Sequence, residues 1–208
     1  MAFGVWISLF VIFFSGGLTP GPAVMLVTTA SMRYGFWPAM APALGICAGN
    51  LIWIVLAVSG ATTLAQVFPQ AFLALKLAGV CFIAWIAWRM AFGGAVELAR
   101  APPPPRRHMF ARGVGLQLAN PNALVFFGGL LPAYIDPDRS PVAQALVIMA
   151  TTTATELIGL VVYAGAADWL SRRFAAKGFA VWFFRFAALA MAASAGFAIW
   201  STWASTGR

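Results

Sequence analysis

Residues 4–32 read GVWISLFVIFFSGGLTPGPAVMLVTTASM, a long apolar stretch without a charged side chain that is interrupted by Thr19-Pro20-Gly21-Pro22. A helix needs about 20 apolar residues to cross the roughly 30 Å hydrocarbon core of a bilayer. This stretch is longer than that. Its prolines remove backbone donors, and its glycine relaxes the dihedral restriction. The sequence therefore predicts a membrane-spanning helix that is broken near its middle.

The composition of the whole chain favours the same class of protein. Of its 208 residues, 62% are hydrophobic and 9% are charged, and its mean hydropathy is +0.88. Soluble domains carry about 25% charged residues, and one soluble core could not hide this much apolar surface. We expect an all-α integral membrane protein. We interpret Val5–Leu18 as a retained helix rather than a signal peptide, because no basic segment precedes it.

Six stretches are long and apolar enough to span a membrane. Their approximate bounds are 4–32, 39–65, 69–93, 113–134, 142–168 and 180–203. A run of four prolines followed by two arginines, Pro102–Arg107, separates the third stretch from the fourth, and such a run is extended and solvated. We therefore predict a first three-helix repeat at 1–94, a Pro/Arg-rich cytoplasmic linker at 95–112, and a second three-helix repeat at 113–208.

The basic residues predict the orientation of these spans. With six spans, ten of them fall on one side of the membrane and three on the other. The ten are Arg33, Arg89, Arg100, Arg106, Arg107, Arg112, Arg172, Arg173, Lys177 and Arg185, and the three are Lys76, Arg139 and Arg208. Because cytoplasmic loops carry an excess of Lys and Arg, we expect a multi-pass protein of the bacterial inner membrane with both termini on the periplasmic side.

The two halves of the chain carry similar features in the same order. The break at Thr19–Pro22 in the first stretch corresponds to Asn120–Asn122 in the fourth, and Asn50 in the second corresponds to Glu156 in the fifth. Three spans is an odd number, so the two halves must be inverted relative to each other. We predict a 3+3 inverted-topology repeat with broken helices 1 and 4, the pattern of a secondary transporter.

Glu156 is the acidic residue nearest the middle of a predicted span. A charge there costs at least about 2.5–3.5 kcal/mol on insertion scales, so it normally faces the bundle interior or a water-filled cavity. Thr152, Thr155, Gly159 and Tyr163 share its helix face. Glu156 could bind a substrate amino group or carry a coupling proton, because apolar surroundings favour the protonated carboxyl. It could also be a structural, neutral carboxyl bonded to a neighbouring helix.

The helix breaks and nearby polar residues complete the predicted site. Breaks free backbone groups at membrane depth, where they are tolerated against protein or a wet cavity, and a half-helix N-terminus suits a carboxylate. Asn50 could bind substrate or join helices as a polar contact. The residues that we expect to bind substrate are Thr19, Pro20, Gly21, Pro22, Asn50, Asn120, Pro121, Asn122 and Tyr163, with Glu156 as the proton-coupling residue.

Other classes of site find little support in the sequence. Cys47 and Cys81 lie inside apolar runs, without metal-ligand spacing around them. There is no GxSxG motif, phosphate-cradling glycine loop or intramembrane metal cluster. We therefore expect no enzyme, no cofactor and no metal site. The net charge of +8 lies in short loops rather than on a basic face, so we expect no nucleic-acid partner.

The two proline motifs carry a resemblance to a known family. Thr19–Pro22, followed by Gly35, Gly45 and Gly49, and the run Ala119–Phe127 that continues to Leu131-Pro132-Ala133-Tyr134 are similar to the lysine exporter (LysE/RhtB-type) amino-acid exporter family. The resemblance covers the whole chain in order. It implies export of amino acids or close derivatives, energised by the proton gradient. Three positions differ, since the family usually has lysine at Asn122, aspartate at Glu156 and a glycine near Ala39.

We therefore expect a proton-coupled exporter that works by alternating access in the lipid bilayer, with an amino acid and the proton as its small partners. The small-residue faces at Gly45 and Gly49 and on residues 188–196 indicate close helix packing, and the second permits a homodimer. The alternatives are an efflux carrier for a metal cation or another small solute, and, from a different class, a membrane-embedded enzyme or scaffold subunit.

Overall fold

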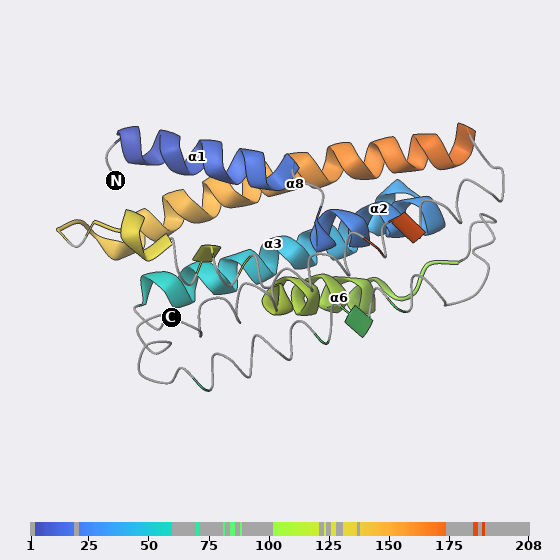
Figure 1. The fold of residues 1–208 in the computed structure, drawn as a ribbon, viewed down its shortest axis with the longest axis horizontal. Helices are drawn as coiled ribbons and strands as arrows, with labels where there is room; N and C mark the ends of the chain where they lie inside the picture. The colour runs from blue at the N-terminus through green and yellow to red at the C-terminus, as the bar shows by residue number, and fades with distance from the viewer. Residues whose placement is uncertain are drawn as a thin grey trace.

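The computed structural model describes residues 3–18, 21–59, 102–120, 131–136 and 138–173, with single positions at 70, 81, 84, 85, 88, 123, 126, 127, 185, 186 and 189. Regular structure in these residues is helical, without a strand. The elements are α1 (Phe3–Leu18), α2 (Pro22–Tyr34), α3 (Phe36–Val58), α6 (Arg106–Ala119), the 3-10 turn η3 (Leu131–Tyr134) and α8 (Pro141–Arg173). The helices α1, α3 and α8 run roughly along one common axis (Figure 1).

Large apolar side chains are exposed along the outer faces of the long helices. They include Phe3 and Val11 on α1, Val55 on α3, and Val142 and Val162 on α8. A soluble protein rarely exposes apolar surface on this scale, whereas lipid covers it without cost. Both α3 and α8 are long and apolar enough to cross a membrane. The described part of the chain is a membrane-embedded helical bundle.

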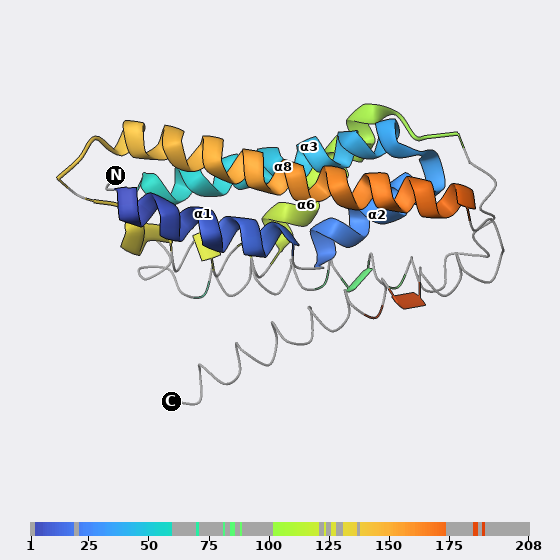
Figure 2. The same ribbon diagram turned by 90° about the horizontal axis from the view of Figure 1, so that it is seen from above.

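The first predicted helix is interrupted where the sequence places Thr19–Pro22. The helix α1 ends at Leu18, and α2 begins at Pro22 after the extended residue Gly21. Proline suits the first helical position, because its missing N–H would have no partner within the helix there. The two pieces are offset, and they follow each other along α8 (Figures 1 and 2). The break therefore gives α8 two successive partners in place of one continuous helix.

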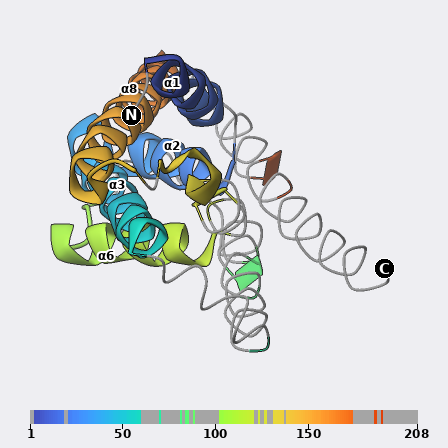
Figure 3. The same ribbon diagram turned by 90° about the vertical axis from the view of Figure 1, so that its left-hand side faces the viewer.

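Seen end-on, α2 lies in the interior of the described bundle (Figure 3). It packs against α3, α6 and α8, and each residue from 22 to 32 is buried. A tight turn at Gly35 then reverses the chain into α3. Gly35 has φ 94°, a conformation that favours glycine, and its N–H donates a 2.8 Å hydrogen bond to the Ser31 carbonyl oxygen. The helix α2 therefore lies inside the described bundle.

Glycines bring α3 and α6 into close contact. A Cβ atom on Gly45 would collide with the backbone carbonyl oxygen of Phe110, and one on Gly113 would collide with that of Pro42. On Gly49 it would lie 2.7 Å from the Gln117 Cβ. Small residues let helix backbones approach each other in a membrane. The predicted close packing at Gly45 and Gly49 is therefore present, and α6 is the partner helix.

The boundary of α6 differs from the prediction. Pro102–Pro105 is non-helical, as expected, but the helix begins at Arg106, inside the range 95–112 predicted as a linker. Pro105 has φ −50° and ψ 134° and directly precedes the first turn. The basic composition of residues 106–112 resembles a loop, yet Arg, Met and Ala are good helix formers. The helix ends at Ala119, and Asn120 is extended.

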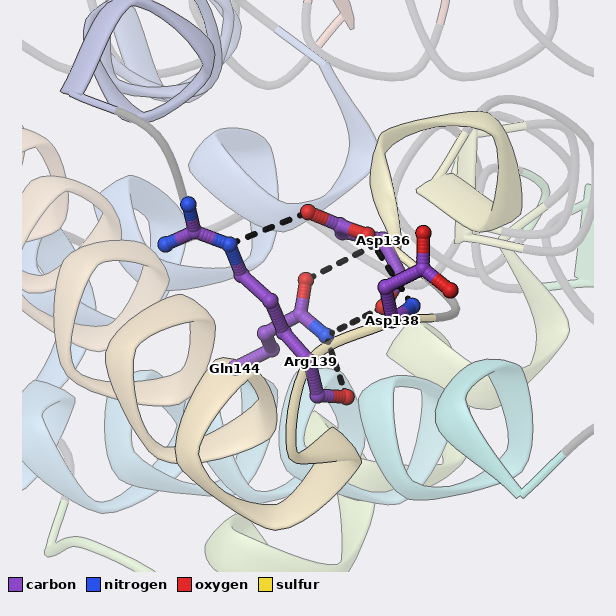
Figure 4. Close-up of polar contacts among 4 residues, drawn as sticks. All are labelled: Asp136, Asp138, Arg139 and Gln144. Carbon is purple, nitrogen blue, oxygen red and sulfur yellow. Dashed lines mark hydrogen bonds and ion pairs between the residues drawn. The ribbon is translucent and has the colours of Figure 1, made fainter.

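A buried glutamine organises the loop that leads into α8 (Figure 4). The Gln144 Oε1 accepts a 2.9 Å hydrogen bond from the Asp136 N–H, and its Nε2 donates to the carbonyl oxygens of Asp136 at 2.9 Å and Arg139 at 3.3 Å. An exposed ion pair joins Arg139 to Asp136 at 3.1 Å. The Asp138 N–H donates to the Asp136 Oδ1 at 3.0 Å. One side chain thus satisfies backbone groups on both sides of the loop.

The helix α8 has 33 residues, or about 50 Å at 1.5 Å per residue. It exceeds a hydrocarbon core of roughly 30 Å and extends the predicted span 142–168 at its C-terminal end, where Arg172 pairs with Asp168 at 2.9 Å. Most of the predicted spans at 69–93 and 180–203 lies outside the described residues. The count of six spans, the inverted repeat and the domain boundaries at 94 and 112 stay predictions.

Candidate functional site

Two apolar clusters occupy opposite ends of the described bundle. The α2-side cluster joins α2 to Ile46 of α3, Leu116 of α6 and Leu160 of α8. The α1-side cluster joins α1 to Trp53 of α3 and Ile148 of α8. Both α3 and α8 therefore pass from one cluster to the other, and their residues between the clusters lie at an intermediate level of the bundle.

Polar side chains and helix ends gather at this intermediate level. On α3 the residue is Asn50, and Gln117 and Asn120 lie at the C-terminal end of α6. On α8 the residues are Thr152 and Glu156, which lie between the apolar residues of the two clusters. The break between α1 and α2 also falls between the clusters. We call this set of residues the polar level.

The start of α2 can be placed relative to α8. The Ser31 hydroxyl donates a 2.6 Å hydrogen bond to the carbonyl oxygen of Ala164, and the two helices run in the same direction (Figures 1 and 2). Pro22 precedes Ser31 by about 14 Å of helix, so α2 begins beside a part of α8 that precedes Ala164. The N–H groups of the first turn of α2 have no partner within the helix.

Buried carboxamides link α3 to the end of α6. The Gln117 Nε2 donates a hydrogen bond to the Asn50 Oδ1, and the Asn120 Nδ2 donates to the Gln117 Oε1 at 3.3 Å. The Gln117 backbone carbonyl oxygen accepts from the Trp53 Nε1 at 3.2 Å and from the Asn120 N–H at 3.2 Å. The helix end is thus satisfied by side chains, as buried polar groups require.

Glu156 is half-buried at the polar level of α8. Its helix, α8, packs against α1, α2 and α3. The ion pairs found within the described residues are Arg139–Asp136 and Arg172–Asp168, and neither involves Glu156. A carboxylate at this depth without a cationic neighbour in the described residues is suited to bind an external cation or a proton.

The predicted site residues have different outcomes. Asn50 and Asn120 are brought together through Gln117, and Gly21 and Pro22 form the start of α2. Tyr163 packs against the α2-side cluster, two turns of helix beyond Glu156. Thr19, Pro20, Pro121 and Asn122 lie outside the described residues.

Gln117 is not among the site residues expected from the sequence. Its signal was available, because it is a polar residue within the predicted span 113–134 that lies three positions before Asn120. Its partner Asn50 is 67 residues away in the sequence. The described residues also contain no group of His, Cys, Asp and Glu able to hold a metal ion.

An interrupted helix and a polar level inside an apolar bundle define the chain as a membrane protein with an internal polar site. The family model described as LysE type translocator matches residues 14–201, and the chain belongs to this family.

Its relatives are named as efflux proteins. A homoserine/homoserine lactone efflux protein of Salmonella typhimurium is 33% identical over 155 residues, 73% of this chain and 74% of the relative. A leucine efflux protein of Klebsiella pneumoniae is 25% identical over 138 residues, 65% of each chain. A threonine efflux protein of Escherichia coli is 24% identical over 144 residues, 64% of this chain and 70% of the relative. These names are those of transporters. No solved structure matches the chain.

Proposed function

We propose that the chain exports a small amino acid or a close derivative across the inner membrane in exchange for protons, by alternating access. Membership of the LysE type translocator family and the efflux names of three relatives support the export of amino acids. The observation that carries the mechanism is the position of Glu156. It is a carboxylate at the polar level, without a cationic neighbour in the described residues.

A single carboxylate that binds either a proton or the ammonium group of the substrate is sufficient for exchange. On the cytoplasmic side, ionised Glu156 would bind the ammonium group of the substrate. On the periplasmic side, a proton would displace the substrate, and the protonated carrier would return. Because the proton and the ammonium group bind the same carboxylate, each turnover moves them in opposite directions.

The start of α2 is suited to the other end of the substrate. Amide groups at a helix N-terminus carry partial positive charge and bind carboxylates, and α2 packs against α8, the helix that carries Glu156. A zwitterion would thus be held at both of its charges. Thr19, Pro20, Pro121 and Asn122 are proposed to line the same path, and both termini are proposed to be periplasmic.

Transport by purified protein tests this function. Proteoliposomes loaded separately with radiolabelled homoserine, leucine or threonine would be diluted into buffer that is more acidic than their interior. We expect efflux of at least one amino acid to be faster than from protein-free vesicles and to slow when the pH gradient is collapsed. If correctly inserted protein moves none of them, the proposed export of amino acids is wrong.

A further inference from the structure

One buried hydroxyl at the polar level lacks a hydrogen-bond partner. The Thr152 side chain is 2% exposed, and its Oγ1 is the buried side-chain polar atom without a partner in the part of the chain that the structure describes. Neighbouring threonines differ. The Thr151 hydroxyl donates to the Val147 carbonyl oxygen at 2.8 Å, and that of Thr155 donates to the Thr151 carbonyl oxygen at 2.9 Å.

The same contrast holds across the other described helices. The buried hydroxyls of Thr28 and Thr29 bond to carbonyl oxygens one turn earlier, and that of Ser31 bonds to α8. Threonine in a helix has this local partner available. A buried hydroxyl that leaves its bond unmade has an uncompensated cost of desolvation, so such a group calls for a specific explanation.

The surroundings of Thr152 suggest what completes its hydrogen bonding. Thr152 precedes Glu156 by four residues, so both side chains lie on the same face of α8, one turn apart. The Thr152 side chain is buried within the bundle, in which α8 packs against α1, α2 and α3. A primary ammonium group has three N–H donors. A carboxylate and a hydroxyl oxygen one helical turn apart can accept two of them.

We propose that Thr152 is a substrate-binding residue whose hydroxyl oxygen accepts a hydrogen bond from the ammonium group held by Glu156. This rests on the proposed function and deepens it, because it defines the substrate class as primary amines with at least two free N–H groups. A tertiary ammonium with one N–H cannot donate to both side chains, and the site should bind it weakly.

The test compares two buried threonines of α8 in proteoliposomes, with homoserine and N,N-dimethylhomoserine as probes. T152V removes the unpaired hydroxyl at nearly constant volume, T152S restores it, and T155V removes a hydroxyl that is already bonded within the helix. We expect T152V to raise the KM for homoserine about tenfold or more, with T152S and T155V near the wild type. We also expect T152V to lose most of the wild-type preference for homoserine over its dimethyl derivative, and to unfold in detergent at no lower temperature than the wild type.

Other outcomes would contradict either the role of Thr152 alone or the proposed function as well. If T152V keeps the wild-type KM and preference, or if T155V impairs transport as strongly as T152V, Thr152 does not bind the substrate. In both cases a transporting wild type leaves the proposed function intact. If the wild type moves neither these probes nor leucine or threonine, the proposed function is wrong, and the role of Thr152 falls with it.

Discussion

The side-chain amide of Gln117 donates a hydrogen bond to the side-chain oxygen of Asn50, and this bond joins the C-terminal end of α6 to the middle of α3. Both residues are buried, with exposed fractions of 5% and 1%. The bond lies between the two apolar clusters, where Asn120 extends it toward the second predicted break. It is therefore a direct polar link between the two predicted halves of the chain.

Removing both members of this pair should cost less stability than the sum of the two single losses. Q117M would remove the hydrogen bonds that the Gln117 side chain makes to Asn50 and Asn120, and we expect the free energy of unfolding to fall by about 1–3 kcal/mol. N50L should act similarly, and the double variant should lose less than the sum of the two. Chemical unfolding in detergent of the four proteins measures the coupling. Strictly additive losses would show that the bond does not stabilise the protein.

The contact between α3 and α6 gives a second prediction. In G45A the new Cβ would meet the Phe110 backbone carbonyl oxygen, which cannot move aside as a flexible side chain could. We expect a loss of about 1–3 kcal/mol, typical of overpacking, seen as a lower unfolding temperature in detergent. The matched control is G165A on α8, where a Cβ would meet no atom within 4 Å. If G45A were as stable as G165A, the two helices would not be in this close contact.

The loop before α8 gives a third prediction. Q144M retains the bulk of the side chain but removes three hydrogen bonds to Asp136 and Arg139, each contributing about 1 kcal/mol. We expect faster hydrogen exchange at the Asp136 amide and a lower stability. The control R139Q removes an exposed ion pair in the same loop, which should cost less than about 1 kcal/mol. Equal effects of the two variants would mean that Gln144 does not hold the loop.

The sequence predicted the parts of the fold that depend on local chemistry. The interruption after Leu18 follows from Pro20-Gly21-Pro22, because no helix passes two prolines there without losing backbone bonds. The start of α6 at Arg106 was not predicted, because a basic segment after four prolines resembles a solvated loop. Besides the helix propensity of its residues, packing of Met109 and Gly113 against the bundle supports this first part of α6, and packing cannot be read from composition.

The candidate site stays a prediction. Glu156, Asn50 and Asn120 were proposed for it because a polar residue in a membrane span is costly and therefore informative. The role of Gln117 depends on a partner far away in the sequence, so it became evident with the fold. Thr152 was placed on the face of Glu156 from its helical spacing. Which of the threonines lacks a partner is set by side-chain rotamers, and these are not encoded in spacing.

We propose that Glu156 couples the proton gradient to export of the substrate. Vesicle transport across a pH gradient tests this coupling most directly. Efflux of the amino acid that the wild type carries best would be followed from proteoliposomes with and without an acidic exterior, for the wild type, E156Q and E156D. We expect acidification of the exterior to accelerate efflux by the wild type, to accelerate it less in E156D, and to have no effect on efflux by E156Q. Acceleration of E156Q to the wild-type extent would contradict it.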